Sequence, residues 1–226
     1  MHDPLANDYK IKPGANSAVR TKKVVQRLAV AVVFLAGYFL GLSNTATTVF
    51  QPEITTTVFQ PEINGYTNLR GVNLQGADLT NENLAGADLM NADLRSADLT
   101  EVNLSGANLS GTKLYYAIFL GSDLSGANLN EANLFEANLN KANLEYADLG
   151  AADLTGANLT GANFYRANLE YAALSGAILT GANFTRVNFQ YADLTGADLT
   201  SADLTDADLD DAILTGATMP DGSIHD

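Results

Sequence analysis

Large apolar residues recur at every fifth position over most of the chain. From Leu69 to Met219, each of the 31 positions whose number ends in 4 or 9 carries Leu, Phe or Met, with no insertion or deletion. A small residue, usually Ala, stands two positions earlier, and Asn or Asp usually stands between the two. Residues five apart lie about 140° apart around an α-helix and on opposite faces of a straight strand, so neither element alone can bury this pattern.

A chain that turns a corner every five residues can bury the pattern. Two residues separated by one position lie on the same side of an extended segment, so the Ala and Leu of each unit face inward together. The next two positions are often Thr-Gly or Ser-Gly, which favour a turn and allow a positive φ. Repetition at one fixed period is typical of a solenoid, so residues 67–221 are expected to form an all-β coil with stacked turns.

The motif A-(D/N)-L-x-x, seen in AADLTGANLTGANF at residues 151–164, resembles that of the pentapeptide repeat family. The resemblance covers 67–221 and implies a right-handed quadrilateral β-helix with four units to a coil. It places Leu and Phe at the centre and Ala77, Ala87, Ala92 and their equivalents as smaller inward partners. The 31 units then make nearly eight coils. At ~4.8 Å per coil, the rod would be about 37 Å long.

An apolar segment precedes the repeats. Residues 28–42 read LAVAVVFLAGYFLGL, and the preceding residues 1–27 are basic, whereas almost no basic residues follow directly. This asymmetry predicts an apolar helix with the N-terminus inside and the rest translocated. A cleaved signal and a retained anchor through residues 24–42 both remain open, because the apolar core is short for a membrane span. We therefore expect either a single-pass membrane protein or a protein that is exported to the periplasm or thylakoid lumen.

Two short segments flank the repeats. The linker at 43–66 contains TTVFQPEI twice, and its prolines disfavour helix. It could be a spacer, or it could cover the open end of the coil. At the other end, Pro220 cannot donate a backbone hydrogen bond to a further coil. Residues 222–226 are therefore expected to form a C-terminal tail that ends the stack.

The charge is divided unevenly. Residues 1–27 hold six basic and two acidic side chains, for a net charge of +4, whereas the chain from Asn64 onward holds six basic and 22 acidic side chains, for a net charge of −16. An acidic surface repels phosphate, so direct nucleic acid binding is excluded. The chain has no Cys, and its two histidines are His2 and His225, so thiol catalysis and activation of Ser or Thr by His are excluded. We expect no enzyme, no cofactor and no metal.

Residues 20 apart should lie directly above one another in a four-sided coil. Tyr171 then stacks under Tyr191, Tyr146 can make a cation–π contact with Arg166, and Arg186 can pair with an acidic residue, Asp206. These columns could simply steady the coil. Alternatively, they form a partner-binding face built on Tyr146, Arg166, Tyr171, Arg186 and Tyr191.

A second irregular stretch is TKLYYAIFLGSDL at residues 112–124, where Lys113 and Ile118 replace the usual Asn or Asp. Outward-pointing apolar residues on a polar rod suggest contact with a partner, a second rod or a membrane surface, unless the repeat has merely degenerated. Tyr115 is expected to stack under Phe135. The expected patch consists of Tyr115, Tyr116, Ile118, Leu120 and Phe135.

Acidic residues gather near the C-terminus. They are Asp193, Asp198, Asp203, Asp206, Asp208, Asp210 and Asp211. Their repeat positions spread them over several faces, which favours a solvated end over a Ca²⁺ site.

Two functions from different classes fit these features. The first is a non-enzymatic, membrane-anchored or exported rod that acts as a scaffold for an unknown protein partner. The resemblance implies the alternative, since some cytoplasmic members of the family present an acidic rod to DNA gyrase as a DNA mimic. The predicted leader argues against that alternative, because it would place the rod outside the cytoplasm. The oligomeric state is left open.

Overall fold

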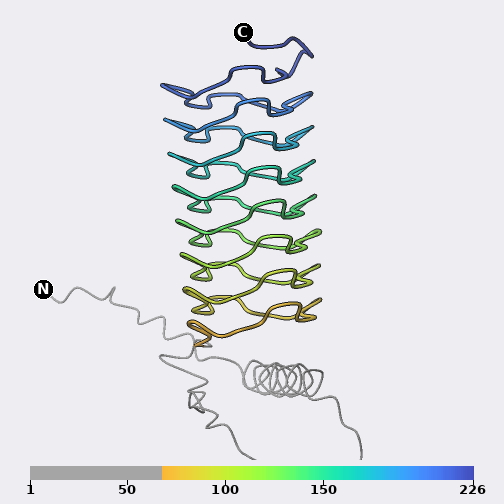
Figure 1. Cartoon of the computed structure of the whole chain (residues 1–226), viewed down its shortest axis with the longest axis vertical. Helices are drawn as coiled ribbons and strands as arrows, with labels where there is room; N and C mark the ends of the chain where they lie inside the picture. Colours follow the sequence, from red (N-terminus) through yellow and green to blue (C-terminus); the bar gives the residue numbers. More distant parts are fainter. Residues whose placement is uncertain (1–67) are drawn as a thin grey trace, which may run out of the picture.

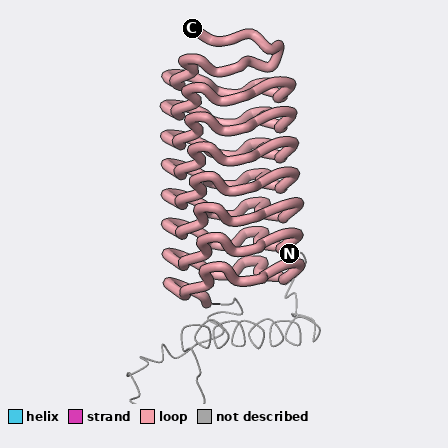
Figure 2. Tube along the Cα trace, turned by 45° about the vertical axis from the view of Figure 1, so that its right-hand side comes forward, coloured by secondary structure: helices cyan, strands magenta, loops and turns pink. Residues whose placement is uncertain are grey.

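The rod is a straight stack of four-sided coils (Figure 1). The computed structural model describes residues 68–226, which contain no helix and no strand longer than a single bridge residue (Figure 2). Parallel bridges join residues 20 apart, from Asn68 with Asp88 through to Asp198 with Thr218. Since each unit has five residues and each coil returns after 20, every coil has four sides. The quadrilateral β-helix expected from the sequence is therefore present.

Each corner contains a residue in the left-handed conformation. Every position numbered 1 or 6 from 71 to 216 has a φ between 50° and 71°, whether or not it is Gly. A hydrogen bond closes each corner, as where the Val72 N–H donates to the Leu69 carbonyl at 3.2 Å. This conformation turns the chain sharply, and Gly adopts it at least cost.

Backbone hydrogen bonds between successive coils hold the stack together. The Leu74 N–H donates to the Asp93 carbonyl at 2.7 Å, and the Asp93 N–H donates back to the Val72 carbonyl at 2.9 Å. The corner residue adds a third bond, as where the Gly76 N–H donates to the Arg95 carbonyl at 2.8 Å. The pattern repeats along the rod, so the buried backbone groups of interior coils find partners in the coils on either side.

The Asn or Asp between the two inward residues stabilises the next corner. Its carboxylate or amide oxygen accepts the N–H of the residue two positions on, as for Asp198 and Thr200 at 3.0 Å. Where the following residue is Thr or Ser, its hydroxyl often donates to the same oxygen. Asn side chains also bond across coils, as where Asn183 Nδ2 donates to Asn163 Oδ1 at 2.9 Å. These bonds explain why short polar side chains recur there.

The interior is a continuous column of Leu and Phe, with Ala beside them. Leu and Phe side chains from Leu69 to Leu199 are at most 2% exposed. Phe164 stacks on Phe184 with ring centroids 5.1 Å apart, and Phe184 packs on Phe189 at the same distance. Because each full coil is covered on both sides, burial of these side chains is the main stabilising contribution to the rod.

The C-terminal tail covers part of the last coil. Thr218 and Ile224 form an antiparallel bridge, and the Gly216 N–H donates to the His225 carbonyl at 2.8 Å. The tail therefore folds back on one side of the stack. The last inward residues are only partly buried: Leu204, Leu209, Leu214 and Met219.

The N-terminal segments lie outside the described residues. The basic region at 1–27, the apolar run at 28–42 and the linker at 43–66 all fall there, so the N-terminal helix and the proposed cap stay predictions. Within the described part of the chain, no helix is long and apolar enough to cross a membrane.

The loss in free energy of unfolding caused by a cavity in the core should depend on the position of the cavity along the stack. We expect Leu149→Ala to lower the free energy of unfolding by about 3 kcal/mol, because Leu149 is 0% exposed and covered from both sides. Leu209→Ala, in the partly buried last coil, should cost about 1 kcal/mol. Urea unfolding followed by circular dichroism measures both, and equal losses would contradict a last coil that is only partly covered.

The carboxylate beside a corner should titrate below its usual range. Hydrogen bonds from the Thr200 hydroxyl and N–H lower the pKa of Asp198 below 3.8. A lowered pKa stabilises the fold at neutral pH, and this stabilisation is lost as the pH falls below 3.8 and through the folded-state pKa. Thr200→Val should raise the pKa of Asp198 and make stability less sensitive to acid in that range. An NMR titration of the carboxyl carbon checks this, and an unchanged pKa would contradict it.

Candidate protein-binding faces

Two opposite sides of the rod carry the residues singled out from the sequence. The first, the Tyr/Arg face, has Asn168 at the middle of a side, between corners at Arg166 and Tyr171. The second, the apolar face, has Ile118 at the middle of a side, between corners at Tyr116 and Gly121. Successive sides are five residues apart, and positions 168 and 118 differ by 50, or two and a half coils. The two sides therefore face in opposite directions on a four-sided coil.

A stacked tyrosine pair forms one edge of the Tyr/Arg face. The rings of Tyr171 and Tyr191 lie 4.9 Å apart and nearly parallel, at 8°. Both side chains are well exposed, at 60% and 47%. The nearby carboxylate of Asp211 raises the pKa of the Tyr191 hydroxyl, with a further contribution from Tyr171. The stacking expected from the 20-residue spacing is confirmed.

An arginine column forms the other edge. Arg166 lies over the Tyr146 ring at 6.0 Å, and Arg186 pairs with Asp206 at 3.2 Å, so both expected contacts are confirmed. The hydrogen bond with Asp206 raises the pKa of the Arg186 guanidinium further. Neighbouring arginines would repel each other, and each here makes a further contact, Arg166 with the Tyr146 ring and Arg186 with Asp206. Among the described residues, Arg166 has no carboxylate within ion-pair distance.

Tyr165 was not among the residues predicted from the sequence to form this face. Its half-buried ring lies 5.3 Å from the Arg166 guanidinium and meets Tyr146 edge-on at 5.8 Å. Tyr165 sits at the same corner as Arg166, one position before it. The 20-residue rule compares a residue only with its own column, so it could not show this diagonal contact with Tyr146.

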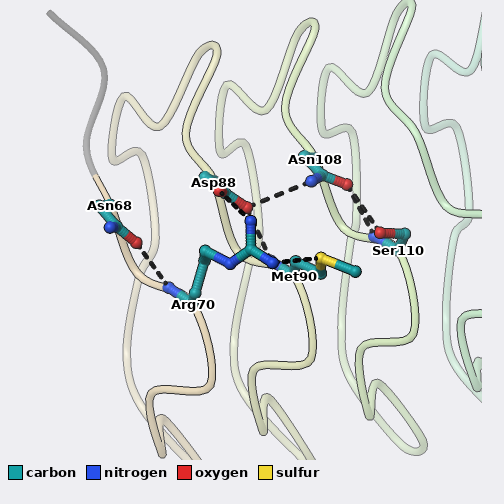
Figure 3. A network of polar contacts seen from close by, with 6 residues as sticks. All are labelled: Asn68, Arg70, Asp88, Met90, Asn108 and Ser110. Atoms are coloured by element: carbon teal, nitrogen blue, oxygen red, sulfur yellow. Dashed lines mark hydrogen bonds and ion pairs between the residues drawn. The ribbon is translucent and has the colours of Figure 1, made fainter. Parts of the chain in front are cut away.

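Side-chain amides form the floor between the two edges. Asn168 Nδ2 donates to Asp148 Oδ1 at 2.9 Å, and Asn188 Nδ2 donates to Asn168 Oδ1 at 3.1 Å. The N-terminal end of the same face shows a related network, in which Asn108 donates to Asp88 and Arg70 pairs with the same carboxylate (Figure 3). The floor side chains are short, so the longer Tyr and Arg side chains project from the corners beside them.

The apolar face carries a belt one coil wide. The apolar belt comprises Tyr115, Tyr116, Ile118 and Leu120, and Phe135, the fifth residue of the predicted patch, lies beside it on the next coil. Tyr116, Ile118 and Leu120 are 49%, 39% and 41% exposed, as expected for outward-pointing side chains. Tyr115 and Phe135 are half-buried.

The aromatic contacts of the belt differ from expectation. The Phe135 ring packs on Tyr116, edge-on at 6.0 Å, and not in a stack on Tyr115. Instead, the Tyr115 hydroxyl accepts a 2.9 Å hydrogen bond from the Arg95 guanidinium. The centroid of the Tyr115 ring lies 5.5 Å from the central carbon of that guanidinium. Arg95 is 20 residues before Tyr115, so the same spacing rule could have found it. The hydrogen bond from Arg95 also lowers the pKa of Asp93.

These surfaces suit binding better than acid–base chemistry. The pKa values of Asp93, Asp198, Asp203 and Asp221 are all lowered, the opposite of what a general acid needs. In residues 68–226, no three His, Asp or Glu side chains are grouped so that they could hold a metal ion. Exposed Tyr and Arg are instead typical of residues that contribute most to protein–protein binding.

Comparison with known proteins identifies the repeats. A family model described as pentapeptide repeats matches in eight copies, at residues 67–106, 103–140, 142–181 and 182–219. No curated protein matches the chain.

Several solved structures are similar. HetL, a pentapeptide repeat protein involved in heterocyst differentiation regulation from the cyanobacterium Nostoc sp. strain PCC 7120, is 42% identical, with 70% of this chain and 78% of HetL covered and a TM-score of 0.37. QnrB1, a plasmid-mediated fluoroquinolone resistance protein, is 20% identical over 67% of this chain and 79% of its own, with a TM-score of 0.39. A pentapeptide repeat protein from the Arabidopsis thaliana thylakoid lumen is 29% identical over 53% of this chain and 66% of its own, with a TM-score of 0.23.

Proposed function

The chain belongs to the pentapeptide repeat family, and from that premise we propose that its rod is a non-enzymatic scaffold that binds a protein partner through the Tyr/Arg face. Members of the family form right-handed quadrilateral β-helices, and the four-sided coil described above is that fold.

The observation that carries the proposal is the presence of large exposed side chains at strained corners. Tyr146, Arg166, Tyr171, Arg186 and Tyr191 all have φ between 57° and 60°. A bulky residue in the left-handed region costs about 1 kcal/mol or more relative to Gly. The same corner columns carry Gly in other coils, so the fold does not require Tyr or Arg there. The Tyr rings and the guanidinium groups at these corners also stay exposed, which supports a role in contact with another molecule.

The composition of the face indicates the chemistry of the partner. Two parallel Tyr rings offer a flat apolar surface for a proline or aromatic side chain. Arg166, which has no described carboxylate partner, offers a cation for an acidic side chain. Asn188 and Gln190 lie between the two edges. A protein surface with an apolar ring flanked by a carboxylate would match both edges.

The location we propose follows from the N-terminal sequence. Basic residues precede the apolar run at 28–42 and almost none follow it directly, which supports export of the rod or anchoring of the rod outside the cytoplasm. On this proposal residues 24–42 enter the membrane, and the partner is an envelope or lumenal protein.

Partner contact can be tested without knowing the partner. A photo-crosslinking amino acid at position 191 should give a discrete adduct in cells, and Tyr171→Asn should abolish it. Asn already occupies such corners at Asn81 and Asn91, so the free energy of unfolding should change by less than about 1 kcal/mol.

The matched control is Ser201→Asn, since Ser201 is an exposed corner residue with a φ of 59° that borders the apolar face. This variant should keep the adduct. An adduct that survives Tyr171→Asn, or the absence of any adduct, would contradict partner binding through the Tyr/Arg face.

Protease protection distinguishes the two candidate functions. If the rod is exported or anchored, protease added outside sealed cells or spheroplasts should reach its linker, and fragment masses should tell a retained anchor from a cleaved signal. Full protection in the cytoplasm would contradict the proposed location. It would instead favour the acidic DNA-mimic function, which inhibition of DNA gyrase supercoiling by the purified protein would then test.

A further inference from the structure

The apolar belt crosses the apolar face at a single coil, and apart from Phe135 on the next coil its surroundings are polar. At the level of the belt the face carries Tyr116, Ile118 and Leu120, where the coils before and after carry Asp98 and Asn138 in the middle. Tyr116 has a φ of 62°, the largest of the non-glycine corners. Contiguous exposed apolar side chains on a polar surface mark a site of contact with another molecule.

The charges around the belt are arranged symmetrically about it. At the corner next to Leu120, Glu101 lies one coil before the belt and Lys141 lies one coil after it. Gly121 stands between them and leaves that corner open. Neither Glu101 nor Lys141 forms an ion pair with another described residue. The two opposite charges are therefore equally displaced from the belt and available to an outside partner.

We infer that the apolar face binds a second copy of this chain, with the two rods antiparallel and a two-fold axis lying along the belt. Such an axis exchanges the coil before the belt with the coil after it. Glu101 of each copy then meets Lys141 of the other, and the two Ile118 side chains meet at the axis. In the middle of the face, the carboxylate of Asp98 meets the amide of Asn138 of the second copy, an acceptor opposite a donor.

The other corner of the apolar face, at Tyr116, follows the same symmetry. Arg95 and Ser96 lie one coil before the belt, and Phe135 and Glu136 lie one coil after it. In the antiparallel pair, the corner with Arg95 faces the corner with Glu136. The guanidinium of Arg95 is already held by Asp93 at 2.6 Å, so it contributes here through its positive field and not as a new ion pair.

Charge also selects antiparallel over parallel packing. A parallel pair would set Asp98 against Asp98 of the second copy, and Asp198 against Asp198, along the middle of the same face. It would also bring the two Asp-rich C-terminal ends side by side. Like charges directly opposite each other are unfavourable, whereas the antiparallel pair separates the acidic ends.

The face is large enough for a stable dimer. Five coils centred on the belt, from the one carrying Asp78 to the one carrying Asn158, can overlap in the antiparallel pair. Each coil presents about five outward residues on a side, which gives about 25 per copy, within the ~20–30 residues per partner of a standard interface. The Tyr/Arg faces would point away from each other. The inference does not rest on the partner proposed for those faces.

The belt itself can be tested with residues that the repeat already uses. The variant Ile118→Asn with Leu120→Thr restores the side chains typical of these positions, so its fold should be at least as stable. Sedimentation velocity of the full chain in detergent micelles should show a dimer, and this variant should weaken dimerisation by at least about tenfold. The matched control is Ile178→Asn, which changes an equally exposed Ile in the same column outside the five overlapping coils.

A charge exchange tests the antiparallel register. Glu101→Lys alone and Lys141→Glu alone should each weaken dimerisation by about tenfold, because each places like charges opposite each other twice. An equimolar mixture of the two variants should recover the dimer, since every Lys then meets a Glu. Both side chains already occur at this corner column, so neither variant disturbs the fold.

Several results would overturn the inference. They are a monomeric wild-type chain, a dimer insensitive to the belt variant, or a dimer weakened equally by Ile178→Asn. A mixture of charge variants that stays monomeric would overturn the antiparallel register. If the wild-type chain is monomeric but the belt variant alone loses binding to lipid vesicles, the belt contacts a membrane surface and the dimer is wrong.

Discussion

The left-handed corner is the constraint on which the rest of the rod depends. One residue in five is held at positive φ from position 71 to 216, and this turn aligns the next side with the coil below. Only then can the N–H of each inward Leu reach a carbonyl 19 residues later. The hydrogen bonds between coils and the apolar interior thus follow from one repeated local conformation. Asn and Asp, which accept the N–H beyond them, stabilise that conformation at almost every unit.

The repeat alone buries the apolar side chains and pairs the backbone hydrogen-bonding groups. The type of residue at each corner is therefore free to vary. Gly fits there with least strain, yet Tyr and Arg occupy several corners at the cost of backbone strain. Local stacking, as between Tyr171 and Tyr191, offsets some of that strain and leaves the rings exposed. Exceptions to the motif therefore carry more information about function than the motif itself. The repeat explains stability, and its irregular corners are where the proposed contacts with other molecules lie.

The two groups of irregular residues lie on opposite sides of the rod and differ in chemistry. The Tyr/Arg face combines cations, stacked rings and amides, which suits a partner with acidic and cyclic side chains. The apolar face carries Ile118 and Leu120 between Glu101 and Lys141, a pattern that matches itself after a two-fold rotation. A rod with one self-complementary side leaves its other side available. The proposed dimer would direct its two Tyr/Arg faces away from each other.

The sequence by itself determined which residues face inward, where the chain turns and which residues share a column. These features depend on local chain geometry repeated at a fixed period, so Tyr171 and Tyr191 could be paired once four units were assigned to a coil. The resemblance to known repeats supplied the number four, and the 20-residue bridges confirm it. Only the tertiary structure decided that Tyr116, and not Tyr115, packs on Phe135, and that the tail covers one side of the last coil. Those contacts depend on the direction of each side chain and on competing partners, neither of which the period specifies.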